Sequence, residues 1–190
     1  MRVIAGVHRG RRLIGPTGQA IRPTADRVRE ALFSILGQRT PGARLLDLYA
    51  GTGAIGIEAL SRGAAHVTFV EANRQALRLL HRNLAACGME QQTRVCAGRV
   101  EDFFRRNQPT SGPYDIIFCD PPYDVTIDLM TSIQTWDTGW FADDGIVVVE
   151  HARKAAIPPT LGWLMPGRRY DYGDTALTVW RVGSKDAPPS

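Results

Sequence analysis

Short apolar runs alternate with helical patterns through the middle of this chain, and no other feature constrains the fold as strongly. Five such runs, most of them β-branched, are expected to be strands: Leu45 to Leu48, Val67 to Val70, Thr93 to Cys96, Ile116 to Cys119 and Ile146 to Val149. Helical patterns lie between the first four, at Ala54 to Arg62, Arg74 to Cys87 and Glu101 to Arg106. Strands and helices in this succession build a mostly parallel sheet with helices on both faces. We therefore expect an α/β fold.

The last part of the chain departs from this alternation. Arg168 to Tyr172 and Ala176 to Val182 are expected to form a hairpin, because the intervening Gly173-Asp174 suits a tight turn. The last strand must then run antiparallel to its neighbour. Residues 184–190 are expected to be a frayed tail.

The amino-terminal stretch predicts a small appendage. Val3 to Ala5 and Leu13 to Ile14 are expected to pair as a β-hairpin, in which Gly10 takes a positive φ. The predicted division of the chain is an appendage at residues 1–40 and a main domain at residues 41–183.

A helix is expected to follow this hairpin. Thr24 is its N-cap candidate, and Gly37 is where it should stop. One apolar stripe at helical spacing should pack on the main domain: Val28, Ala31, Leu32, Ile35 and Leu36. Arg27 and Arg29 lie outside that stripe, so we expect both to point away from the body.

Charge is unevenly distributed along the chain. Residues 1–44 contain nine arginines against Asp26 and Glu30, which gives a net charge of +7. The whole chain has a net charge of +4, so the remaining residues carry −3. This asymmetry suggests an arm for polyanions on a body with a different task. A basic face that is merely solvated is the alternative.

Size and composition exclude several classes of protein. At 190 residues, the chain has room for one domain and a small appendage, and no run approaches the ~20 apolar residues of a membrane helix. No export signal is evident. Cys87, Cys96 and Cys119 are expected to be buried, reduced thiols of a cytoplasmic protein. The four histidines are scattered, so no metal site is expected.

A glycine-rich segment follows the first predicted strand. Gly51, Gly53 and Gly56 match G-x-G-x-x-G, and Glu71 ends the next strand. Such glycines let a nucleoside cofactor approach the backbone, and the carboxylate accepts hydrogen bonds from ribose hydroxyls. A dinucleotide site or a purely structural turn would match as well. Asp47 favours S-adenosylmethionine, because a carboxylate beside the loop repels a pyrophosphate and attracts an ammonium and a sulfonium.

A second segment, Asp120-Pro121-Pro122-Tyr123, follows the fourth predicted strand. The prolines remove backbone donors and fix φ, so we expect carbonyl oxygens to point outward from a rigid turn. The Asp120 carboxylate and the Pro121 carbonyl can accept both hydrogens of an exocyclic amine and stabilise charge as its nitrogen reacts. Tyr123 can stack on the base that carries the amine. A strand-terminating turn without a chemical role is the alternative.

Both segments resemble motifs of known enzymes. The order Asp-x-Tyr-Ala-Gly-Thr-Gly from Asp47 resembles the first motif of the class I methyltransferases. Asp-Pro-Pro-Tyr resembles the amino-methyltransferase motif that acts on adenine N6, guanine N2 or the glutamine side-chain nitrogen. The resemblance implies a Rossmann-like sheet and an S-adenosylmethionine site formed by Asp47, Tyr49, Ala50, Gly51, Thr52, Gly53, Glu71, Val100 and Asp120. It implies catalytic roles for Asp120, Pro121, Pro122 and Tyr123.

The amino-terminal residues narrow the resemblance. Arg2 to Gly6, Arg9 to Leu13 and Arg22 to Phe33 are similar to the bacterial 16S ribosomal RNA guanine-N2 methyltransferases that act on guanine 966, and the similarity runs over residues 1–182. It implies methylation of a guanine amine, with 16S ribosomal RNA or the small ribosomal subunit as the partner. It also implies an RNA-facing arm that includes Arg2, Arg9, Arg11, Arg12, Arg22 and Arg27.

One position departs from the family pattern. The family usually holds the adenine amine with an acid followed by a small residue after the third strand, whereas Arg99-Val100 stands here. Val100 can still offer its backbone N–H to the adenine ring, with Glu101 or Asp102 as the acid. The alternatives are an adenine-N6 amino-methyltransferase, an NAD-dependent oxidoreductase, which leaves Asp47 unexplained, and a non-catalytic RNA-binding module, which leaves both motifs unexplained.

Overall fold

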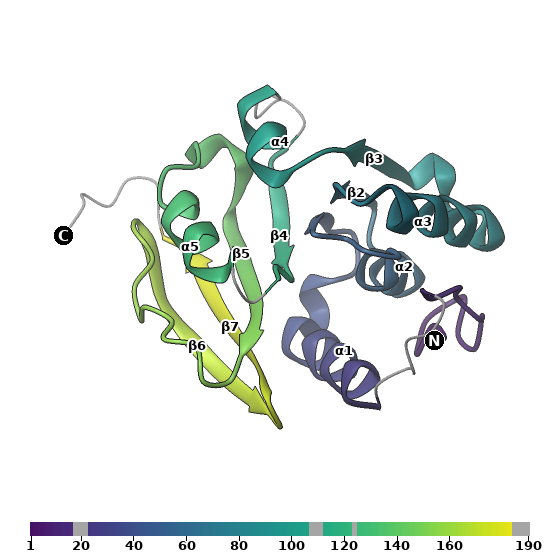
Figure 1. Ribbon diagram of the computed structural model, residues 1–190, viewed down its shortest axis with the longest axis horizontal. Coiled ribbons are helices and arrows are strands. Elements are labelled where there is room, and N and C mark those ends of the chain that lie inside the picture. The colour runs from purple at the N-terminus through teal and green to yellow at the C-terminus, as the bar shows by residue number, and fades with distance from the viewer. Residues whose placement is uncertain (17–22, 107–111, 123–124, 184–190) are drawn as a thin grey trace.

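The computed structural model describes residues 1–16, 23–106, 112–122 and 125–183 (Figure 1). Arg22, Tyr123 and the predicted tail at residues 184–190 lie outside the described residues. The centre of the molecule is a seven-stranded sheet in the order β3-β2-β1-β4-β5-β7-β6. Its strands are β1 Arg44–Leu48, β2 His66–Glu71, β3 Thr93–Ala97, β4 Tyr114–Cys119, β5 Phe141–Ala152, β6 Leu164–Tyr172 and β7 Thr175–Val182.

The sheet is parallel from β3 to β5 and antiparallel beyond it. β1 pairs in parallel with both β2 and β4, and β7 runs antiparallel to β5 and β6. The predicted mostly parallel sheet with an antiparallel last strand is therefore confirmed. Chain order reverses at β1, and the carboxyl ends of β1 and β4 meet at the crevice where open α/β sheets bind ligands.

Strand limits agree best in the centre of the sheet. The first four predicted strands match β1 to β4 within two residues at each end, and Gly173 makes the expected turn with φ +62°. β5 extends well beyond the predicted Ile146 to Val149 on both sides, and β6 begins at Leu164 instead of Arg168. Apolar runs locate strands, but pairing with a long antiparallel neighbour decides how far they extend.

Helices cover both faces of the sheet. They are α1 Pro23–Leu36, α2 Ala54–Ser61, α3 Arg74–Cys87, α4 Val100–Arg106 and α5 Thr126–Ile133, with 3-10 turns at Gly37–Arg39, Glu90–Gln92 and Thr138–Trp140. One core lies between the sheet and α1, α2 and α3, and the other lies between the sheet and α4 and α5. The sequence did not predict α5. Burial of Leu129, Met130 and Ile133 holds this short helix in place although its threonines favour helix weakly.

Two predictions for α1 are wrong. The helix begins at Pro23, a residue favoured at the first helical position, so Thr24 lies in the first turn instead of capping it. Arg29 does not point away from the body, since only 3% of it is exposed. Its Nη2 donates to the Arg2 carbonyl oxygen (2.7 Å) and to Asp26 Oδ1 (3.0 Å). Burial lowers the pKa of Arg29, against the attraction of Asp26 and Glu58.

The amino-terminal arm, residues 1–14, is held by α2 and by backbone hydrogen bonds between its own two halves, such as Val3 N to Arg11 O (2.9 Å). The predicted β-hairpin reduces to one isolated bridge between Arg2 and Arg12, although Gly10 has the expected positive φ of +84°. Glu58 of α2 is fully buried and accepts hydrogen bonds from the backbone N–H groups of Ile4 (2.7 Å) and Ala5 (2.9 Å). The boundary predicted at residue 40 stays a prediction.

Two further contacts fasten the arm. Gly6 has φ +83°, and a Cβ there would lie 1.7 Å from the carbonyl oxygen of Ser61, so no side chain fits at this position. Asn83 of α3 accepts from Ile14 N (2.8 Å) and donates to the carbonyl oxygens of Ile14 and Thr52 (both 3.0 Å). Asn83 thus joins the end of the arm to the loop after β1.

Within the described ranges, no helix is long and apolar enough to cross a membrane, and no group of three His, Cys, Asp or Glu residues is arranged to hold a metal ion. The three cysteines are free. Cys87 and Cys119 are buried as expected, whereas Cys96 is partly exposed, contrary to the prediction.

Candidate active site

The loop between β1 and α2 turns sharply at the carboxyl edge of the sheet. Tyr49, Gly51 and Gly53 all have positive φ, at 62°, 56° and 81°. Ala50 N donates to Val70 O (3.0 Å), which fastens the loop to β2. Positive φ is unfavourable for tyrosine, so the surrounding fold must hold Tyr49 in this conformation.

The three motif glycines serve different purposes. A Cβ on Gly53 would lie 2.2 Å from Leu80 Cδ1, and one on Gly56 would lie 2.2 Å from the Phe69 ring. Both glycines are therefore required where α2 packs on α3 and β2. Only Gly51 has open space around its missing side chain, with no other atom within 4 Å of a Cβ built there. Packing alone therefore explains why Gly53 and Gly56 are glycines, whereas it does not explain Gly51; the role of the loop in binding a cofactor stays a prediction.

Glu71 stands at the end of β2 and braces the loop. Its Oε2 accepts from Gly51 N (2.7 Å) and its Oε1 accepts from Asn73 N (2.6 Å). Asn73 in turn caps α3 by accepting from the N–H groups of Gln75 and Ala76. Each carboxylate oxygen of Glu71 keeps a second lone pair for a ligand.

Asp47 lies beneath the loop in β1, with 1% of its surface exposed. Its Oδ2 accepts from Gly56 N (3.1 Å). Burial raises the pKa of Asp47 to about 8, the Gly56 hydrogen bond opposes the rise, and the charges of Asp120 and Glu71 add to it. A nearby cation would favour the ionised carboxylate, because opposite charge lowers the pKa of an acid.

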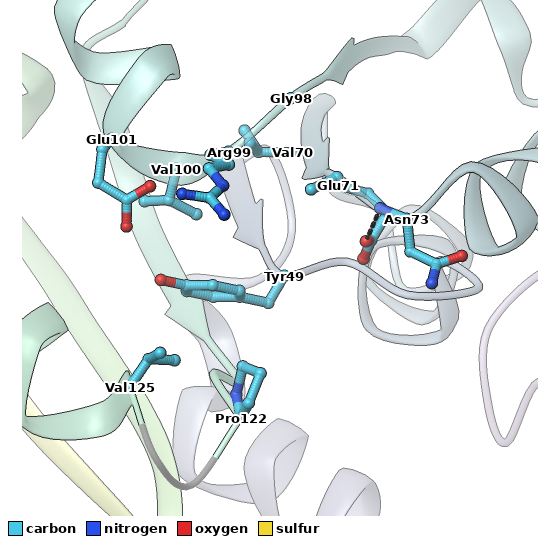
Figure 2. Close-up of a pocket in the computed structure, with 11 residues that line it drawn as sticks. Tyr49, Val70, Glu71, Asn73, Gly98, Arg99, Val100, Glu101, Pro122 and Val125 are labelled. Carbon is cyan, nitrogen blue, oxygen red and sulfur yellow. Dashed lines mark hydrogen bonds between the residues drawn. The ribbon is translucent and has the colours of Figure 1, made fainter.

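A cavity of about 340 Å³ opens beside the loop (Figure 2). Its lining consists of Tyr49, Val70, Glu71, Ala72, Asn73, Gly98, Arg99, Val100, Glu101, Pro122 and Val125. Figure 2 shows Tyr49 between Pro122 and Val125 on one side and Arg99 and Val100 on the other. Glu71 and Glu101 lie at opposite ends of the lining. The result is a mostly apolar slot with a carboxylate at each end.

The structure brings together only part of the predicted cofactor site in that lining. Tyr49, Glu71 and Val100 line the cavity, together with Pro122 of the predicted catalytic residues. The other residues predicted for the cofactor are not among those that line it: Asp47, Ala50, Gly51, Thr52, Gly53 and Asp120. The apolar wall from Val70 and Val125 was missed, because its parts come from β2 and from the segment before α5.

Of the two acids considered beside Val100, the geometry favours Glu101. Asp102 is engaged in ion pairs with Arg105 and, at 3.9 Å, with Arg106. Glu101 lines the cavity. Burial raises the pKa of the Tyr49 hydroxyl, and the charge of Glu101 adds to this effect.

The Asp120-Pro121-Pro122 turn follows β4 at the same edge of the sheet. Asp120 N donates to Leu48 O (3.4 Å), so the turn starts in register with the end of β1. The Pro122 carbonyl oxygen accepts from Val125 N (3.0 Å) and from the Thr126 hydroxyl (3.4 Å), so it does not point outward as predicted. Burial raises the pKa of the Asp120 carboxyl group to about 6, although the residue as a whole is exposed.

Glu150 is an acid at this edge that the sequence did not single out. β4 and β5 are in register at Cys119 and Val149, so Asp120 and Glu150 are the next residues along adjacent parallel strands. Burial raises the pKa of Glu150 to about 8, and the charge of Asp120 adds to the rise. A glutamate after three valines reads as the exposed end of a strand, so only the register reveals its neighbour.

The arginines predicted to face RNA lie on the surface where the structure describes them. Arg2, Arg9, Arg11, Arg12 and Arg27 are exposed, as is Val7 at the tip of the arm with 84% of its surface accessible. Arg29, by contrast, is buried among internal contacts and does not contribute to this surface.

Comparison with known proteins shows the family. The family model described as Conserved hypothetical protein 95 matches residues 1–181. "Putative rRNA methyltransferase YlbH" from Bacillus subtilis is 35% identical over 183 residues, covering 95% of this chain and 98% of its own length. "Ribosomal RNA small subunit methyltransferase D" from Escherichia coli is 37% identical over 163 residues, covering 83% of this chain and 78% of its own length.

A solved structure agrees with this relationship. "Putative methyltransferase yhhF" from Escherichia coli superimposes with a TM-score of 0.80 at 34% identity, covering 97% of this chain and 99% of its own. SMU.776, "a putative methyltransferase complexed with SAH", shares the fold at a TM-score of 0.64 and 19% identity, over 84% of this chain and 50% of its own. The expected class I methyltransferase fold is confirmed. The chain belongs to the Conserved hypothetical protein 95 family, together with the small-subunit ribosomal RNA methyltransferases that it resembles.

Proposed function

We propose that this protein transfers a methyl group from S-adenosylmethionine to the exocyclic N2 amine of a guanine in 16S ribosomal RNA, at guanine 966. The observation that carries the proposal is the meeting of two strand ends. The Asp120-Pro121-Pro122 turn starts beside Leu48, where the glycine loop leaves β1. An amine acceptor and a nucleoside-derived donor bound at these two segments would be neighbours. The E. coli and B. subtilis relatives, whose names specify ribosomal RNA, support RNA as the acceptor.

The cavity fits S-adenosylmethionine in its chemistry. Glu71 keeps free lone pairs at one end for ribose hydroxyls, and Val70, Val100 and Val125 offer apolar surface to an adenine ring. Val100 N–H and Glu101, whose residues line the cavity, would contact the adenine edge. Asp47 would face the methionine ammonium across the loop, where a cation relieves the cost of its burial. When bound, this donor supplies an electrophilic methyl group on a sulfonium.

The turn after β4 would orient the acceptor. The Asp120 carboxylate and the Pro121 carbonyl accept the two amine hydrogens, which directs the nitrogen lone pair toward the loop after β1. As positive charge develops on that nitrogen, the carboxylate stabilises it. Asp120 is at the protein surface and has a pKa raised to about 6, so it is ionised at neutral pH. It can also take up the amine proton that is released.

Recognition of the RNA is assigned to the arm. Arg2, Arg9, Arg11, Arg12 and Arg27 are exposed, and neutralisation of phosphates by arginine drives nucleic-acid binding. Arg22 is assigned to the same surface by family resemblance alone. The base to be methylated would leave its stack to reach Asp120, as in other enzymes that act on exocyclic groups.

The test is transfer of labelled methyl from S-adenosylmethionine to small ribosomal subunits that lack the modification, followed by nucleoside analysis and mapping. We expect N2-methylguanosine at position 966 with the wild-type chain and none with Asp120→Ala. Asp144→Asn, which removes a carboxylate from the opposite end of β5, should keep wild-type activity. Labelled N6-methyladenosine would indicate an adenine enzyme instead. Absence of any labelled nucleoside, with NAD bound in place of S-adenosylmethionine, would overturn the proposal.

A further inference from the structure

Glu150 and Asp120 form a pair of carboxylates on one face of the sheet. Ile116 and Phe118 of β4 and Ile146 and Val148 of β5 all contribute to the core beneath α1, α2 and α3. Side chains alternate along a strand, so the next residues of the same parity, Asp120 and Glu150, point to that same face. Across β7, the Cα partner of Glu150 is Leu177, which belongs to this core as well.

This pairing is unfavourable in the absence of a ligand. Two carboxylates in register on neighbouring strands repel each other, and each raises the cost of ionising the other. Neither side chain has a hydrogen-bond or ion-pair partner within the part of the chain that the structure describes. His151, the next residue of β5, is by contrast fully satisfied, with ring nitrogens bonded to Ala152 O (2.9 Å) and Thr178 Oγ1 (2.8 Å).

We propose that Glu150 is a positioning and specificity residue that accepts a hydrogen bond from the ring N1–H next to the amine held by Asp120. This inference rests on the proposed function. Guanine presents N1–H and the N2 amine side by side, so Glu150 would accept from N1–H while Asp120 and the Pro121 carbonyl accept the two amine hydrogens. Adenine presents an unprotonated N1 beside its N6 amine, and the lone pair of that nitrogen would face the Glu150 carboxylate. Glu150 therefore selects guanine over adenine for the same amine chemistry.

The state of the free protein agrees with this role. The pKa of Glu150 is raised to about 8 by burial and by Asp120, so a ligand that donates N–H groups to both acids relieves a cost present before binding. Binding a base with N1–H thus draws Glu150 toward its ionised form. A base without that donor can be bound only by the protonated acid, so it is the ionised carboxylate that selects guanine.

The experiment uses the full chain and small-subunit RNA in which the nucleotide methylated by the wild type is either guanine or 2-aminopurine. The analogue keeps the C2 amine but has an unprotonated N1. The wild type should methylate guanine faster. Glu150→Gln turns an amide N–H toward N1, and should lower the guanine-to-2-aminopurine rate ratio about 10- to 100-fold, the range for a hydrogen bond to a charged group. Asp144→Asn, on the same strand, should keep the wild-type ratio.

The outcomes separate the two proposals. N2-methylguanosine from the wild type, with an unchanged ratio in Glu150→Gln, would overturn the role of Glu150 and leave the proposed function standing. Failure of the wild type to methylate guanine N2 would overturn both. S-adenosylmethionine affinity equal to wild type establishes that the variant is folded. Should Glu150→Gln not fold, Glu150→Asp withdraws the carboxylate by one methylene, and a lower rate on guanine with no change on 2-aminopurine is then the expected result.

Discussion

Two regions of this protein handle carboxylates in opposite ways. Where the arm meets α2, Glu58 is fully buried and has four partners: the N–H groups of Ile4 and Ala5, Arg62 Nε at 2.8 Å, and Arg29 Nε at 3.9 Å. At the carboxyl edge of the sheet, Asp47 has one hydrogen bond, and Asp120 and Glu150 have only each other within the described residues.

The number of partners distinguishes an acid that stabilises the fold from an acid that is available to a ligand. A buried charge with a complete set of partners fixes one arrangement of the chain, and its removal disrupts folding. Acids whose pKa values are raised by burial and by one another are held in readiness for a ligand. On the proposed function, the same residue type is therefore structural under the arm and functional at the sheet edge.

The largest effect is expected from removing the Glu58 carboxylate, which tests whether this buried acid is structural. Glu58→Ala removes one of the two acids that face the buried Arg29 and leaves two backbone N–H groups without acceptors, so the free energy of unfolding should fall by about 3–5 kcal/mol. Urea denaturation measures the change. Glu30→Ala, at an exposed position of α1, should cost little. Equal losses in the two variants would mean that the Glu58 cluster does not secure the arm.

Removal of Asp120 tests the functional side. Asp120→Ala should lower kcat by about 10²–10³, the usual loss when a group that stabilises developing charge is removed. S-adenosylmethionine affinity and stability should stay near wild type, because the side chain has no hydrogen-bond partner among the described residues. Asp120→Asn keeps one acceptor oxygen and should lose less. A near wild-type rate for Asp120→Ala in single-turnover transfer would contradict the role proposed for Asp120 in holding the acceptor amine.

The pH dependence of stability sharpens the comparison at Asp47. Its pKa is raised from 3.8 to about 8, so the folded chain holds a proton that the unfolded chain releases. The resulting stabilisation is complete below about pH 4 and is lost as pH rises toward 8. Relative to Asp47→Asn, the wild type should lose on the order of 1–5 kcal/mol across this window, at about 1.4 kcal/mol per pKa unit.

Urea midpoints at several pH values measure this difference. Comparison with Asp47→Asn cancels the other titrating groups, among them His66 and His151, whose pKa values are lowered by burial and which act in the opposite direction. Parallel pH curves for the two proteins would show that Asp47 stays ionised in the fold.

The smallest effect concerns the exposed surface of the arm. Neutralising Arg9, Arg11 and Arg12 together should weaken RNA binding and reduce the slope of log affinity against log salt by about 2, since single-stranded contacts contribute roughly 0.7 each. S-adenosylmethionine affinity should not change. The matched variant neutralises Arg74, Arg78 and Arg82, which are exposed on α3. If only this second variant flattens the salt dependence in filter binding, recognition lies on α3 and not on the arm.

The sequence predicted those features that depend on short-range pattern. Apolar, β-branched runs located β1 to β4, and the helical pattern from Arg74 to Cys87 located α3. The motif residues Tyr49, Glu71, Val100 and Pro122 proved to line one cavity. In each case the physical cause lies within a few residues of the position concerned.

The failures have non-local causes. Arg29 adjoins the apolar stripe of α1, and a pair with Asp26 in the same helix is equally compatible with an exposed side chain, whereas its contacts with Arg2 and Glu58 come from distant parts of the chain. The arm does not form a regular hairpin, because α2 accepts its backbone hydrogens at Ile4 and Ala5 in place of a partner strand. The proximity of Glu150 to Asp120 can be seen only from the register of β5 against β4.

One short helix, α2, fixes the distance between the glycine loop and the arm. α2 leaves the glycine loop at Ala54 and reaches the arm through Glu58 and Ser61, so its eight residues span about 12 Å. Asn83 provides a second link, since its side-chain amide donates to the carbonyl oxygens of both Thr52 and Ile14. The arm is thus held at a fixed distance from the loop between β1 and α2. On the proposed function, an RNA bound to the arm by its phosphates would present only a nucleotide at the matching distance, so spacing itself would select the target before any base is recognised.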